Sequence, residues 1–416
     1  LTVAMTGSLG TRVFSEQHSV ARLGALGAHA FDLLRTGRER LLRGRLDDAG
    51  RAAIERWFAA RPPPPTDANA GIIRGANLLM IQAEAMQGWV IGATHNGQEI
   101  TPFLNKLRER ALVYTALADE SAQGMTSDAE YAALNSQLPL GQGAVAFLRA
   151  DNRFHTLAHA LHDAGYSTLS AHPYKKGFWN RAVLHPRYGF TRSLFSEDLG
   201  PGQVIGWGLS DDAFFQRMLP ELAALPGPFF AFLVTLSLHH PYDHFPDALK
   251  RLDLGALEGS ALGNYLHGMH HLDGALARLF AALGELGLAD TTMVAIYGDH
   301  DSRLPLSPEL LTLAGVTTWT TATPLQQDRI AGLLVLPRSQ DHEAAHGEVT
   351  AVGGHIDLAP TLLHYLGVPT PRSFIGRPLL PAQPDPGFAA FSDGSAIGDG
   401  HAFAAAGRGV GQAGAC

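Results

Sequence analysis

The sequence of 416 residues is almost free of cysteine and has no long apolar run. Its single cysteine, Cys416, excludes a disulfide within the chain, which suits a cytosolic protein and also an exported one that folds without disulfides. The longest apolar run, residues 229–238, has the length of a strand and falls short of the roughly 18 to 20 residues of a membrane span. The chain begins at Leu1 without a signal peptide, so we expect a fragment or processed form of a longer protein.

Positive charge is also scarce. The chain has 31 Lys and Arg residues against 39 Asp and Glu residues, a formal net charge of -8 and a pI of about 6.2. A nucleic-acid-binding domain normally presents a basic face, so this balance argues against nucleic acid as a partner. Hydrophobic residues make up 46% of the chain, which is enough for a large core, and we expect one main domain with an appendage.

Two flanking segments differ from the rest of the chain. Residues 1–70 are interpreted as a helical linker arm, because apolar residues recur at helical spacing between arginines before a run of four prolines. This basic amphipathic arm could rest on a membrane surface or pack on the domain with a solvated face, and the sequence leaves both open. Residues 71–397 are interpreted as the main domain, and residues 398–416, rich in glycine and alanine, as a loosely ordered tail.

The main domain alternates between predicted strands and helices. Apolar runs predict strands at residues 77–82, 166–170, 228–237, 291–297 and 330–336. Helical patterns occupy residues 102–110, a segment just after 126, and residues 155–164, 262–286 and 356–366. Thr101 fits an N-cap before Pro102, and Ser127 and Glu130 fit a capping box. This alternation predicts an α/β fold with a central, mostly parallel sheet sandwiched by helices.

Acids and imidazoles follow three of the predicted strands. Glu84 follows the first strand, His239 and His240 follow strand 228–237, and Asp299 and His300 follow strand 291–297. Any one of them alone is more often a turn or cap residue, but ligands of open α/β sheets bind beyond the carboxyl ends of the strands. Glu, Asp and His together suit a divalent ion such as Mn²⁺ or Zn²⁺. Asp299 and His300 can reach one ion only if the chain turns there.

Thr126 is the candidate nucleophile. It precedes a predicted helix N-terminus, whose free N–H groups and positive dipole favour a bound phosphate. A threonine hydroxyl needs activation, which a metal held by Glu84, Asp299 and His300 could supply by binding the Thr126 oxygen and lowering its pKa. Local sequence alone favours a plain N-cap at Thr126, with Ser127 an equally good candidate.

Seven short segments occur in one order along the chain, and together they are far more specific than any one alone. They are Asn77-Leu-Leu-Met-Ile-Gln-Ala-Glu84, Thr101-Pro-Phe-Leu-Asn105, Gly124-Met-Thr-Ser-Asp-Ala-Glu130, Phe178-Trp-Asn-Arg181, Leu236-Ser-Leu-His-His-Pro-Tyr242, Tyr297-Gly-Asp-His-Asp301 and Gly353-Gly-His-Ile-Asp-Leu-Ala-Pro-Thr-Leu-Leu363. This set resembles the lipoteichoic acid synthase family of the alkaline phosphatase/sulfatase superfamily, whose relatives include the phosphoglycerol transferases of periplasmic glucans. The resemblance runs from about residue 75 to 395.

The resemblance implies a phosphoglycerol transferase with a sulfatase-like catalytic domain and a small C-terminal subdomain. The donor would be phosphatidylglycerol, the acceptor a periplasmic glucan or polyglycerol phosphate, and the carrier of glycerol phosphate a threonine that matches Thr126. One divalent ion, Mn²⁺ with Mg²⁺ or Zn²⁺ as alternatives, would be held by Glu84, Thr126, Asp299 and His300. The domain would lie on the extracytoplasmic face of a bacterial inner membrane and contact it through segments upstream of Leu1.

The resemblance also implies a headgroup pocket formed by Trp179, Arg181 and His240. Arg181 could clamp a phosphate with two parallel hydrogen bonds, and His240 could bind the phosphoryl group or move a proton. His239 stands where the family often has Asn, so it is either a spare residue or it widens the polar site. Further candidate substrate-binding residues, in segments that are similar to those of the family, are His172 and His355.

Other activities of the superfamily remain open alternatives. A phosphodiesterase or phosphatase would let water resolve the Thr126 intermediate, and an acceptor site needs no motif that would reveal it. A phosphoethanolamine transferase uses a similar metal and threonine, but such enzymes usually carry disulfides, which this chain cannot form. A type I sulfatase requires a Cys/Ser-x-Pro-x-Arg motif, which the sequence lacks.

Overall fold

The computed structural model describes residues 24–27, 29–31, 33, 34, 37, 46–320, 323, 327–337, 346–381, 386–398, 401–403 and 414–415. The chain divides into two compact units, Leu1–Pro65 and Thr66–Cys416. In the first unit, α3 (Asp48–Ala60) is a helix whose N-cap, Asp47, accepts a hydrogen bond from the backbone N–H of Gly50 at 2.7 Å. This helix falls in the segment that we interpret as an arm, of which residues 1–23 and 38–45 lie outside the described residues.

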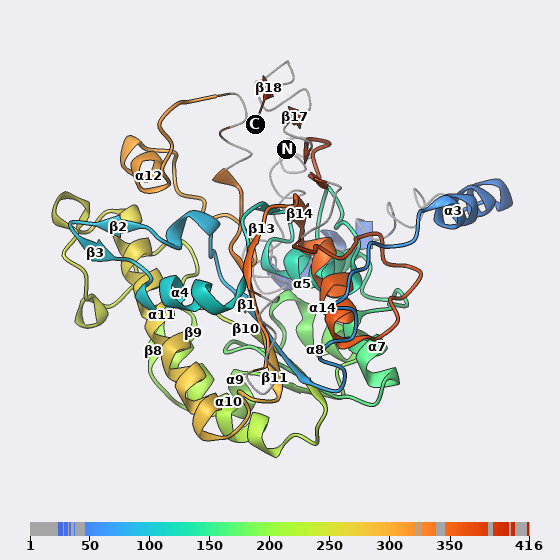
Figure 1. Cartoon of the computed structure of the whole chain (residues 1–416), viewed down its shortest axis with the longest axis horizontal. Helices are drawn as coiled ribbons and strands as arrows, with labels where there is room; N and C mark the ends of the chain where they lie inside the picture. Colours follow the sequence, from blue (N-terminus) through green and yellow to red (C-terminus); the bar gives the residue numbers. More distant parts are fainter. Residues whose placement is uncertain are drawn as a thin grey trace. The chain divides into compact units, whose positions relative to one another are not determined.

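An eight-stranded sheet forms the centre of the second unit, in the order β13-β4-β12-β11-β1-β10-β6-β7 (Figure 1). Its strands are β1 (Asn77–Ala83), β4 (Leu112–Tyr114), β6 (Ser167–Ala171), β7 (Arg192–Leu194), β10 (Phe229–Val234), β11 (Thr292–Gly298), β12 (Gly332–Val335) and β13 (Gly347–Val349). Within this sheet, β12 is antiparallel to both of its neighbours and the other pairs are parallel. Every residue of β1, β10 and β11 is buried, so the predicted mostly parallel, covered sheet is confirmed.

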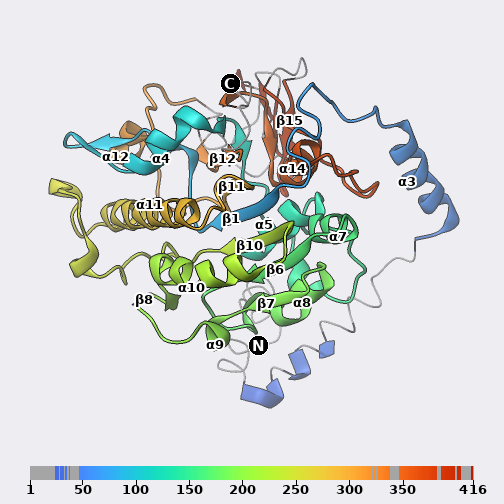
Figure 2. The ribbon, with the colours of Figure 1, turned by 60° about the horizontal axis from the view of Figure 1, so that its bottom comes forward.

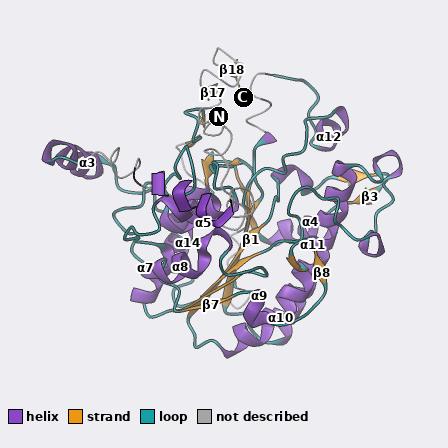
Figure 3. Ribbon diagram, turned by 180° about the vertical axis from the view of Figure 1, so that it is seen from behind, coloured by secondary structure: helices purple, strands orange, loops and turns teal. Residues whose placement is uncertain are grey.

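Helices cover both faces of this sheet (Figure 2). One group contains α4 (Pro102–Leu107), α10 (Asp211–Ala224) and α11 (Ala261–Glu285). The other contains α5 (Thr126–Asn135), α6 (Val145–Leu148), α7 (Leu157–Asp163), α8 (Arg181–Arg187) and α14 (Leu358–Leu366). Figure 3 shows strands lying between the two groups. None of the described helices combines the length and the apolarity that crossing a bilayer requires.

The start of α4 is capped by a residue that the sequence pattern did not indicate. Thr101 precedes the helix as predicted, but its side chain makes no capping hydrogen bond. The carboxylate of Asp273, on α11, instead accepts hydrogen bonds from the backbone N–H groups of Phe103 and Leu104, at 2.9 and 2.8 Å. A partner 170 residues away therefore supplies the acceptor that a local N-cap would have supplied.

The capping box predicted for α5 is wrong. The helix begins at Thr126 itself, one residue earlier than predicted, and its N-cap is Met125 at φ 45°. Ser127 donates its hydroxyl to the carbonyl oxygen of Gly124, at 2.8 Å, and Glu130 faces a buried arginine instead of the N-cap. A carbonyl three residues away thus takes the Ser127 hydroxyl, and a distant arginine takes the Glu130 carboxylate that the box would have used.

Smaller sheets complete the second unit. A C-terminal antiparallel sheet has the order β15-β16-β17-β18, with β15 (Phe388–Ala390), β16 (Ala396–Gly398), β17 (His401–Phe403) and β18 (Gly414–Ala415). It agrees with the small C-terminal subdomain that the resemblance implied, and its last two strands lie within the segment predicted as a tail. A short hairpin consists of β8 (Val204–Ile205) and β9 (Gly208–Leu209).

Candidate active site

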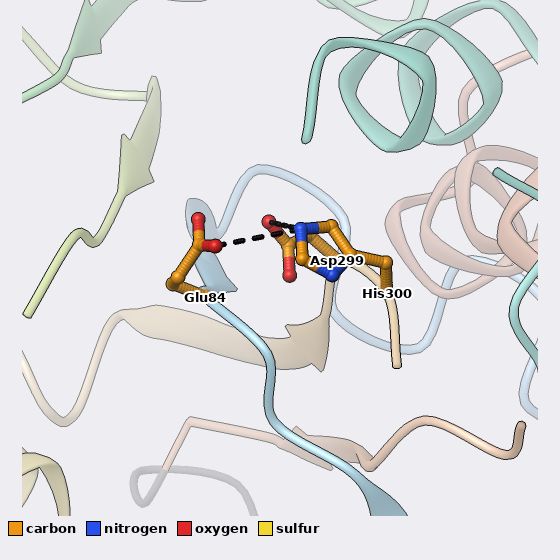
Figure 4. Close-up of side chains that lie close together, drawn as sticks. All are labelled: Glu84, Asp299 and His300. Atoms are coloured by element: carbon orange, nitrogen blue, oxygen red, sulfur yellow. Dashed lines mark ion pairs between the residues drawn. The ribbon is translucent and has the colours of Figure 1, made fainter. Parts of the chain in front are cut away.

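Three residues at the ends of two neighbouring parallel strands form a buried cluster. Glu84 follows β1, and Asp299 and His300 follow β11, which pairs with β1. Each residue has a ligand atom within 4.8 Å of those of the other two, and their side chains point toward one another (Figure 4). We call Glu84, Asp299 and His300 the metal cluster.

A close contact between backbones sets the spacing of the two carboxylates. A Cβ atom on Gly298 would lie 2.0 Å from the carbonyl oxygen of Met86, so only glycine fits there. The backbone N–H of Asp299 donates to the carbonyl oxygen of Ala83 at 3.1 Å. The Asp299 Oδ1 atom in turn accepts a hydrogen bond from the backbone N–H of Ala85 at 2.7 Å. The end of β11 is thereby tied to the end of β1.

The orientation of His300 leaves one ring nitrogen for a ligand. Its Nδ1–H donates to the carbonyl oxygen of Asp301 at 2.8 Å, so Nε2 faces the cluster, 3.4 Å from Glu84 Oε1 and 3.4 Å from Asp299 Oδ2. Among the described residues, this buried Asp299 oxygen has no hydrogen-bond partner. An unsatisfied carboxylate oxygen beside a second carboxylate and an imidazole fits a divalent cation, and the oxygen and nitrogen donors suit Mn²⁺, Mg²⁺ or Zn²⁺.

The pKa values of the metal cluster reflect two acids crowded in a buried space. Burial opposes ionisation of Glu84, but the hydrogen bond from His300 and nearby histidine charges lower its pKa to about 2. Burial and then the Glu84 charge raise the pKa of Asp299 well above its ordinary value. Burial disfavours the charged form of His300, yet the two carboxylates raise its pKa well above the ordinary value. The cluster therefore needs positive charge, which a bound cation would provide.

Thr126 lies at this cluster. Its hydroxyl is 3.4 Å from Glu84 Oε2 and 3.5 Å from His300 Nε2, although the three residues are far apart in sequence. Thr126 is buried at the first position of α5, where the helix dipole is positive, and the N–H groups of Ser127 and Asp128 donate to the carbonyl oxygens of Gly124 and Met125 at 2.9 Å. The side-chain amide of Gln82, on β1, donates to the Thr126 carbonyl oxygen at 3.1 Å and ties α5 to the sheet.

The loop before Thr126 is held by the helix that follows it. Asp128 Oδ2 accepts hydrogen bonds from the backbone N–H groups of Ala122 and Gly124, at 3.1 and 2.8 Å. A Cβ atom on Gly124 would lie 2.2 Å from Asp128 Oδ1, so the loop approaches the carboxylate more closely than any other residue would allow. Asp128 is therefore a positioning residue for the threonine.

Arg181 is buried and already paired. It begins α8, and its Nε and Nη2 atoms donate to Glu130 at 2.6–3.2 Å, while His185 lies 2.9 Å from the same carboxylate. We call Glu130, Arg181 and His185 the ion-pair cluster. The predicted parallel clamp on a phosphate is wrong for this edge of the guanidinium, because Glu130 occupies it. The Nη1 atom has no hydrogen-bond partner among the described residues and remains for a ligand.

His172 offers a second unsatisfied atom close to the ion-pair cluster. Its Nδ1–H donates to the carbonyl oxygen of Val234 at 3.2 Å, and its buried Nε2 has no partner among the described residues. Burial and then the charge of Arg181 lower the pKa of His172 well below its ordinary value, so the ring is neutral and Nε2 is an acceptor. Trp179, also buried, packs its ring 5.7 Å from those of Phe147 and Phe178.

The other predicted histidines lie at the mouth and at the back of the site. His239 and His240 follow β10 and are partly exposed, with the His239 Nδ1–H donating to the His240 carbonyl oxygen at 2.7 Å. His355 is buried behind the strand end. Its Nε2–H donates to the Gly298 carbonyl oxygen at 3.1 Å, and its Nδ1 accepts from the Glu120 backbone N–H at 3.2 Å. Both ring nitrogens of His355 are engaged by backbone, which is the geometry of a positioning residue.

Sequence reasoning missed three residues near the site. Glu130, assigned to a capping box, is the partner of Arg181. Arg303 has a positive φ of 54° and supplies the main charge that lowers the pKa of His240, after burial. Trp207 stacks on His239. Arg303 follows the Asp299 segment directly and could have been noticed, whereas Glu130 and Trp207 depend on contacts between distant segments.

Comparison with known proteins identifies the family of this arrangement. Residues 76–368 match the profile of the sulfatase family, a span that holds the whole metal cluster and Thr126. The chain belongs to the sulfatase family. It is an enzyme domain of that family, and the predicted alkaline phosphatase/sulfatase-like fold is confirmed.

Within the sulfatase family, the chain is similar to lipoteichoic acid synthases, so the resemblance drawn from the sequence is confirmed. It is 28% identical over 388 residues to the lipoteichoic acid synthase-like YvgJ of Bacillus subtilis strain 168, covering 92% of this chain and 62% of the relative. It is 30% identical over 370 residues to lipoteichoic acid synthase 1 of the same strain, covering 86% and 56%. The chain thus spans about 60% of the length of these curated relatives.

The chain is also similar in three dimensions to a solved structure. The lipoteichoic acid synthase LtaP from Listeria monocytogenes superimposes with a TM-score of 0.76 and 26% identity, covering 84% of this chain and 87% of that one. The fold and the residues around Thr126 therefore stand in a known enzyme architecture.

Proposed function

We propose that this chain is the catalytic domain of a phosphoglycerol transferase, which moves glycerol phosphate from a phosphatidylglycerol-type lipid to an acceptor hydroxyl. The observation that carries the proposal is the position of Thr126, whose hydroxyl lies within 3.5 Å of Glu84 and His300 at a helix N-terminus. Similarity to proteins named lipoteichoic acid synthase supports this class of transfer.

The metal cluster would hold one divalent ion, for which we favour Mn²⁺ over Mg²⁺ and Zn²⁺, with Thr126 as a further protein ligand. Such an ion supplies Lewis-acid chemistry that lowers the pKa of a neighbouring hydroxyl. The chain itself provides the oxygen and nitrogen donors, the helix N-terminus and the close backbone contact at Gly298 that keeps the donors in place.

The first half of the reaction forms a bond from Thr126 Oγ1 to the donor phosphorus and breaks the bond from phosphorus to the diacylglycerol oxygen. The positive end of the α5 dipole would favour the negative charge of the phosphoryl oxygens. Burial and then the charges of Arg303 and His239 lower the pKa of His240, so its neutral ring can accept the hydroxyl proton and give it to the departing alcohol.

The headgroup would fit the two unsatisfied atoms at and near the ion-pair cluster, whose Glu130 lies on the same helix as Thr126. Arg181 Nη1 donates to an oxygen of the glycerol phosphate, and the neutral His172 Nε2 accepts from a glycerol hydroxyl. Trp179 packs nearby against Phe178. One donor and one acceptor, both buried, match a ligand that carries hydroxyls next to an anion.

In the second half, an acceptor hydroxyl attacks the phosphothreonine and frees Thr126. If water takes this place, the domain is a phosphodiesterase, so the acceptor decides between transfer and hydrolysis. We place the domain on the extracytoplasmic face of a bacterial membrane, with membrane contact made by segments outside this chain, because the donor is a membrane lipid.

Trapping the intermediate tests the proposal. Protein incubated with Mn²⁺ and phosphatidylglycerol, without acceptor, should show a glycerol-phosphate adduct on the peptide that contains Thr126. Thr126→Ala should abolish both the adduct and diacylglycerol release, and Thr126→Ser should retain part of both because the hydroxyl survives. Ser127→Ala is the matched control, since that hydroxyl is bonded to Gly124. An adduct on Ser127, or diacylglycerol release by Thr126→Ala, would refute the assignment.

A further inference from the structure

The hairpin of β8 and β9 holds one tryptophan in a fixed place. Its turn consists of Gly206, at φ 62°, and Trp207. A Cβ atom on Gly206 would lie 2.7 Å from the ring of His244, and one on Gly208 would lie 2.2 Å from the carbonyl oxygen of Pro173. The hairpin therefore packs tightly against the segments that follow β6 and β10, which fixes the backbone that carries Trp207.

Trp207 belongs to an aromatic cluster. Its ring centroid lies 4.0 Å from that of His239, with the planes inclined by 34°. The rings of Tyr174 and Phe178 approach it at 5.9 and 5.6 Å. Even so, 44% of Trp207 remains exposed. We call Trp207, His239, Tyr174 and Phe178 the aromatic platform.

The aromatic platform borders the proposed donor site on two sides. Phe178 packs against Trp179 with ring centroids 5.7 Å apart. His239 precedes His240 in the loop after β10, and the end of β10 is tied to the metal cluster by the backbone N–H of Glu84, which donates to the Thr235 hydroxyl at 2.9 Å. A molecule resting on Trp207 would therefore lie close to Trp179 and to the loop that carries His240.

We infer that the aromatic platform binds a sugar ring of the acceptor, so that the acceptor of the proposed transferase is a glycan. This inference rests on the proposed function and names the substrate class of the same site. A pyranose has a face of C–H bonds that packs on an aromatic ring and a rim of hydroxyls that needs polar partners. Trp207 offers a partly exposed ring, and His239, whose Nδ1–H is taken by the His240 carbonyl, offers Nε2 to a hydroxyl.

Other occupants fit the aromatic platform less well. A membrane-docking surface needs a contiguous apolar patch, which typically reaches a few hundred Å². In the described hairpin, Val204 is the other large apolar side chain that is strongly exposed, and two side chains make a small patch. A polyglycerol-phosphate chain has no ring face to stack on an indole.

The transfer step balances without a further reactant. A sugar hydroxyl resting on the platform attacks the phosphorus of phosphorylated Thr126. The new bond joins the sugar oxygen to phosphorus, the bond from phosphorus to Thr126 Oγ1 breaks, and the proton of the sugar hydroxyl ends on Thr126. Glycerol phosphate leaves on the sugar, and the enzyme returns to its starting state.

Binding and transfer together test the inference. A glucose hexamer should bind the full chain in calorimetry without donor, and Trp207→Ala should weaken that binding by about tenfold or more, the range of one aromatic contact. Trp207→Phe should keep most of the affinity because a flat ring remains. Trp319→Ala, which removes an indole that is 58% exposed and outside the platform, should leave binding unchanged. In transfer assays, the KM for the hexamer should rise in parallel.

Three results would overturn the inference. The first is absence of hexamer binding by the native chain, and the second is equal binding by Trp207→Ala. The third is a Trp207→Ala variant that loses binding to phosphatidylglycerol vesicles or use of a glycerol-phosphate oligomer while hexamer binding persists. These readouts do not depend on an adduct at Thr126, so the proposed function can fail while the sugar site stands, and the reverse.

Discussion

Two buried clusters in this domain each contain a glutamate and a histidine, but their third member is an arginine in one and an aspartate in the other, so their charge is balanced differently. In the ion-pair cluster, Glu130 meets Arg181 at 2.6 Å and His185 at 2.9 Å. In the metal cluster, the atoms stand 3.4 Å apart and two carboxylates share one imidazole. In the first cluster the Glu130 carboxylate meets both of its cations within the protein, and the atom left without a hydrogen-bond partner among the described residues is the donor Arg181 Nη1; in the second, that atom is the acceptor Asp299 Oδ2.

The difference shows that a shifted pKa does not by itself identify a ligand site. The pKa of Glu84 and that of Glu130 are both lowered to about 2 against the effect of burial. For Glu130 the cause is the permanent charge of Arg181, followed by His185. For Glu84 it is His300, whose own positive charge depends on the two acids. Only the metal cluster needs a cation from outside.

The largest expected effect is a loss of metal binding when the metal cluster, and not the ion-pair cluster, is changed. Asp299→Asn should weaken Mn²⁺ binding and turnover by more than about 100-fold, which is the upper range for residues that merely support a ligand. The asparagine keeps an oxygen for the Ala85 N–H and removes a charge next to Glu84. In EDTA the melting temperature should therefore stay equal or rise. Calorimetric Mn²⁺ titration and thermal unfolding measure both, and strong Mn²⁺ binding by the variant would disprove the metal cluster.

A substitution in the ion-pair cluster should instead change stability and not metal binding. Glu130→Gln should lower the free energy of unfolding by about 3 kcal/mol or more, with or without metal, because it leaves Arg181 buried without its counter-charge. The control is Glu221→Gln, which breaks the largely exposed pair with Arg192 and should cost less than about 1 kcal/mol. Denaturant unfolding in EDTA gives both values. Equal losses in the two variants would contradict the comparison.

A smaller expected effect tests whether Arg181 also binds the donor lipid. Arg181→Lys should raise the KM for phosphatidylglycerol by about tenfold, since an ammonium cannot hold Glu130 and reach a ligand with a planar fork. Affinity for Mn²⁺ should not change. Arg187→Lys on the same helix is the control, because that exposed side chain bonds only to the Ala150 carbonyl among its described contacts. An unchanged KM in Arg181→Lys would confine Arg181 to a structural role.

The smallest expected effect is a dependence of the free energy of unfolding on pH. Because the pKa of Glu130 falls from 4.5 to about 2 on folding, its contribution to stability is present above pH 4.5 and is lost as the pH falls toward 2. Between pH 5 and pH 3 the native chain should therefore lose about 1–2 kcal/mol more than Glu130→Gln. Denaturant unfolding of both proteins in EDTA at the two pH values measures this, and parallel losses would count against it.

Sequence patterns were sufficient for the central strands of the sheet because these are buried on both faces, whereas the three-residue strands β4, β7 and β13 were not predicted. The apolar runs at 77–82, 228–237 and 291–297 match β1, β10 and β11 to within a few residues. Helix starts were less predictable, since Asp273 caps α4 from 170 residues away and Arg181 takes Glu130 from its expected capping role. Local signals cannot reveal such partners.

The same distinction applies to the site. Glu84, Asp299 and His300 could be predicted because each directly follows a parallel strand, and parallel strands end at one edge of a sheet. The aromatic platform could not be predicted, because it depends on a hairpin folding against Pro173 and His244. The position of His355 behind the strand end likewise depends on packing rather than on spacing in the chain.

The contact between Gly298 and the Met86 carbonyl has a consequence for engineering this enzyme. Since backbone atoms set the carboxylate spacing, a designer can exchange apolar side chains throughout β1 and β11 without redesigning the ligand geometry. A single added methyl group at position 298 would force the two strand ends apart. In a mutational library, Gly298 should thus rank among the most intolerant positions, although its side chain is one hydrogen atom and touches no substrate.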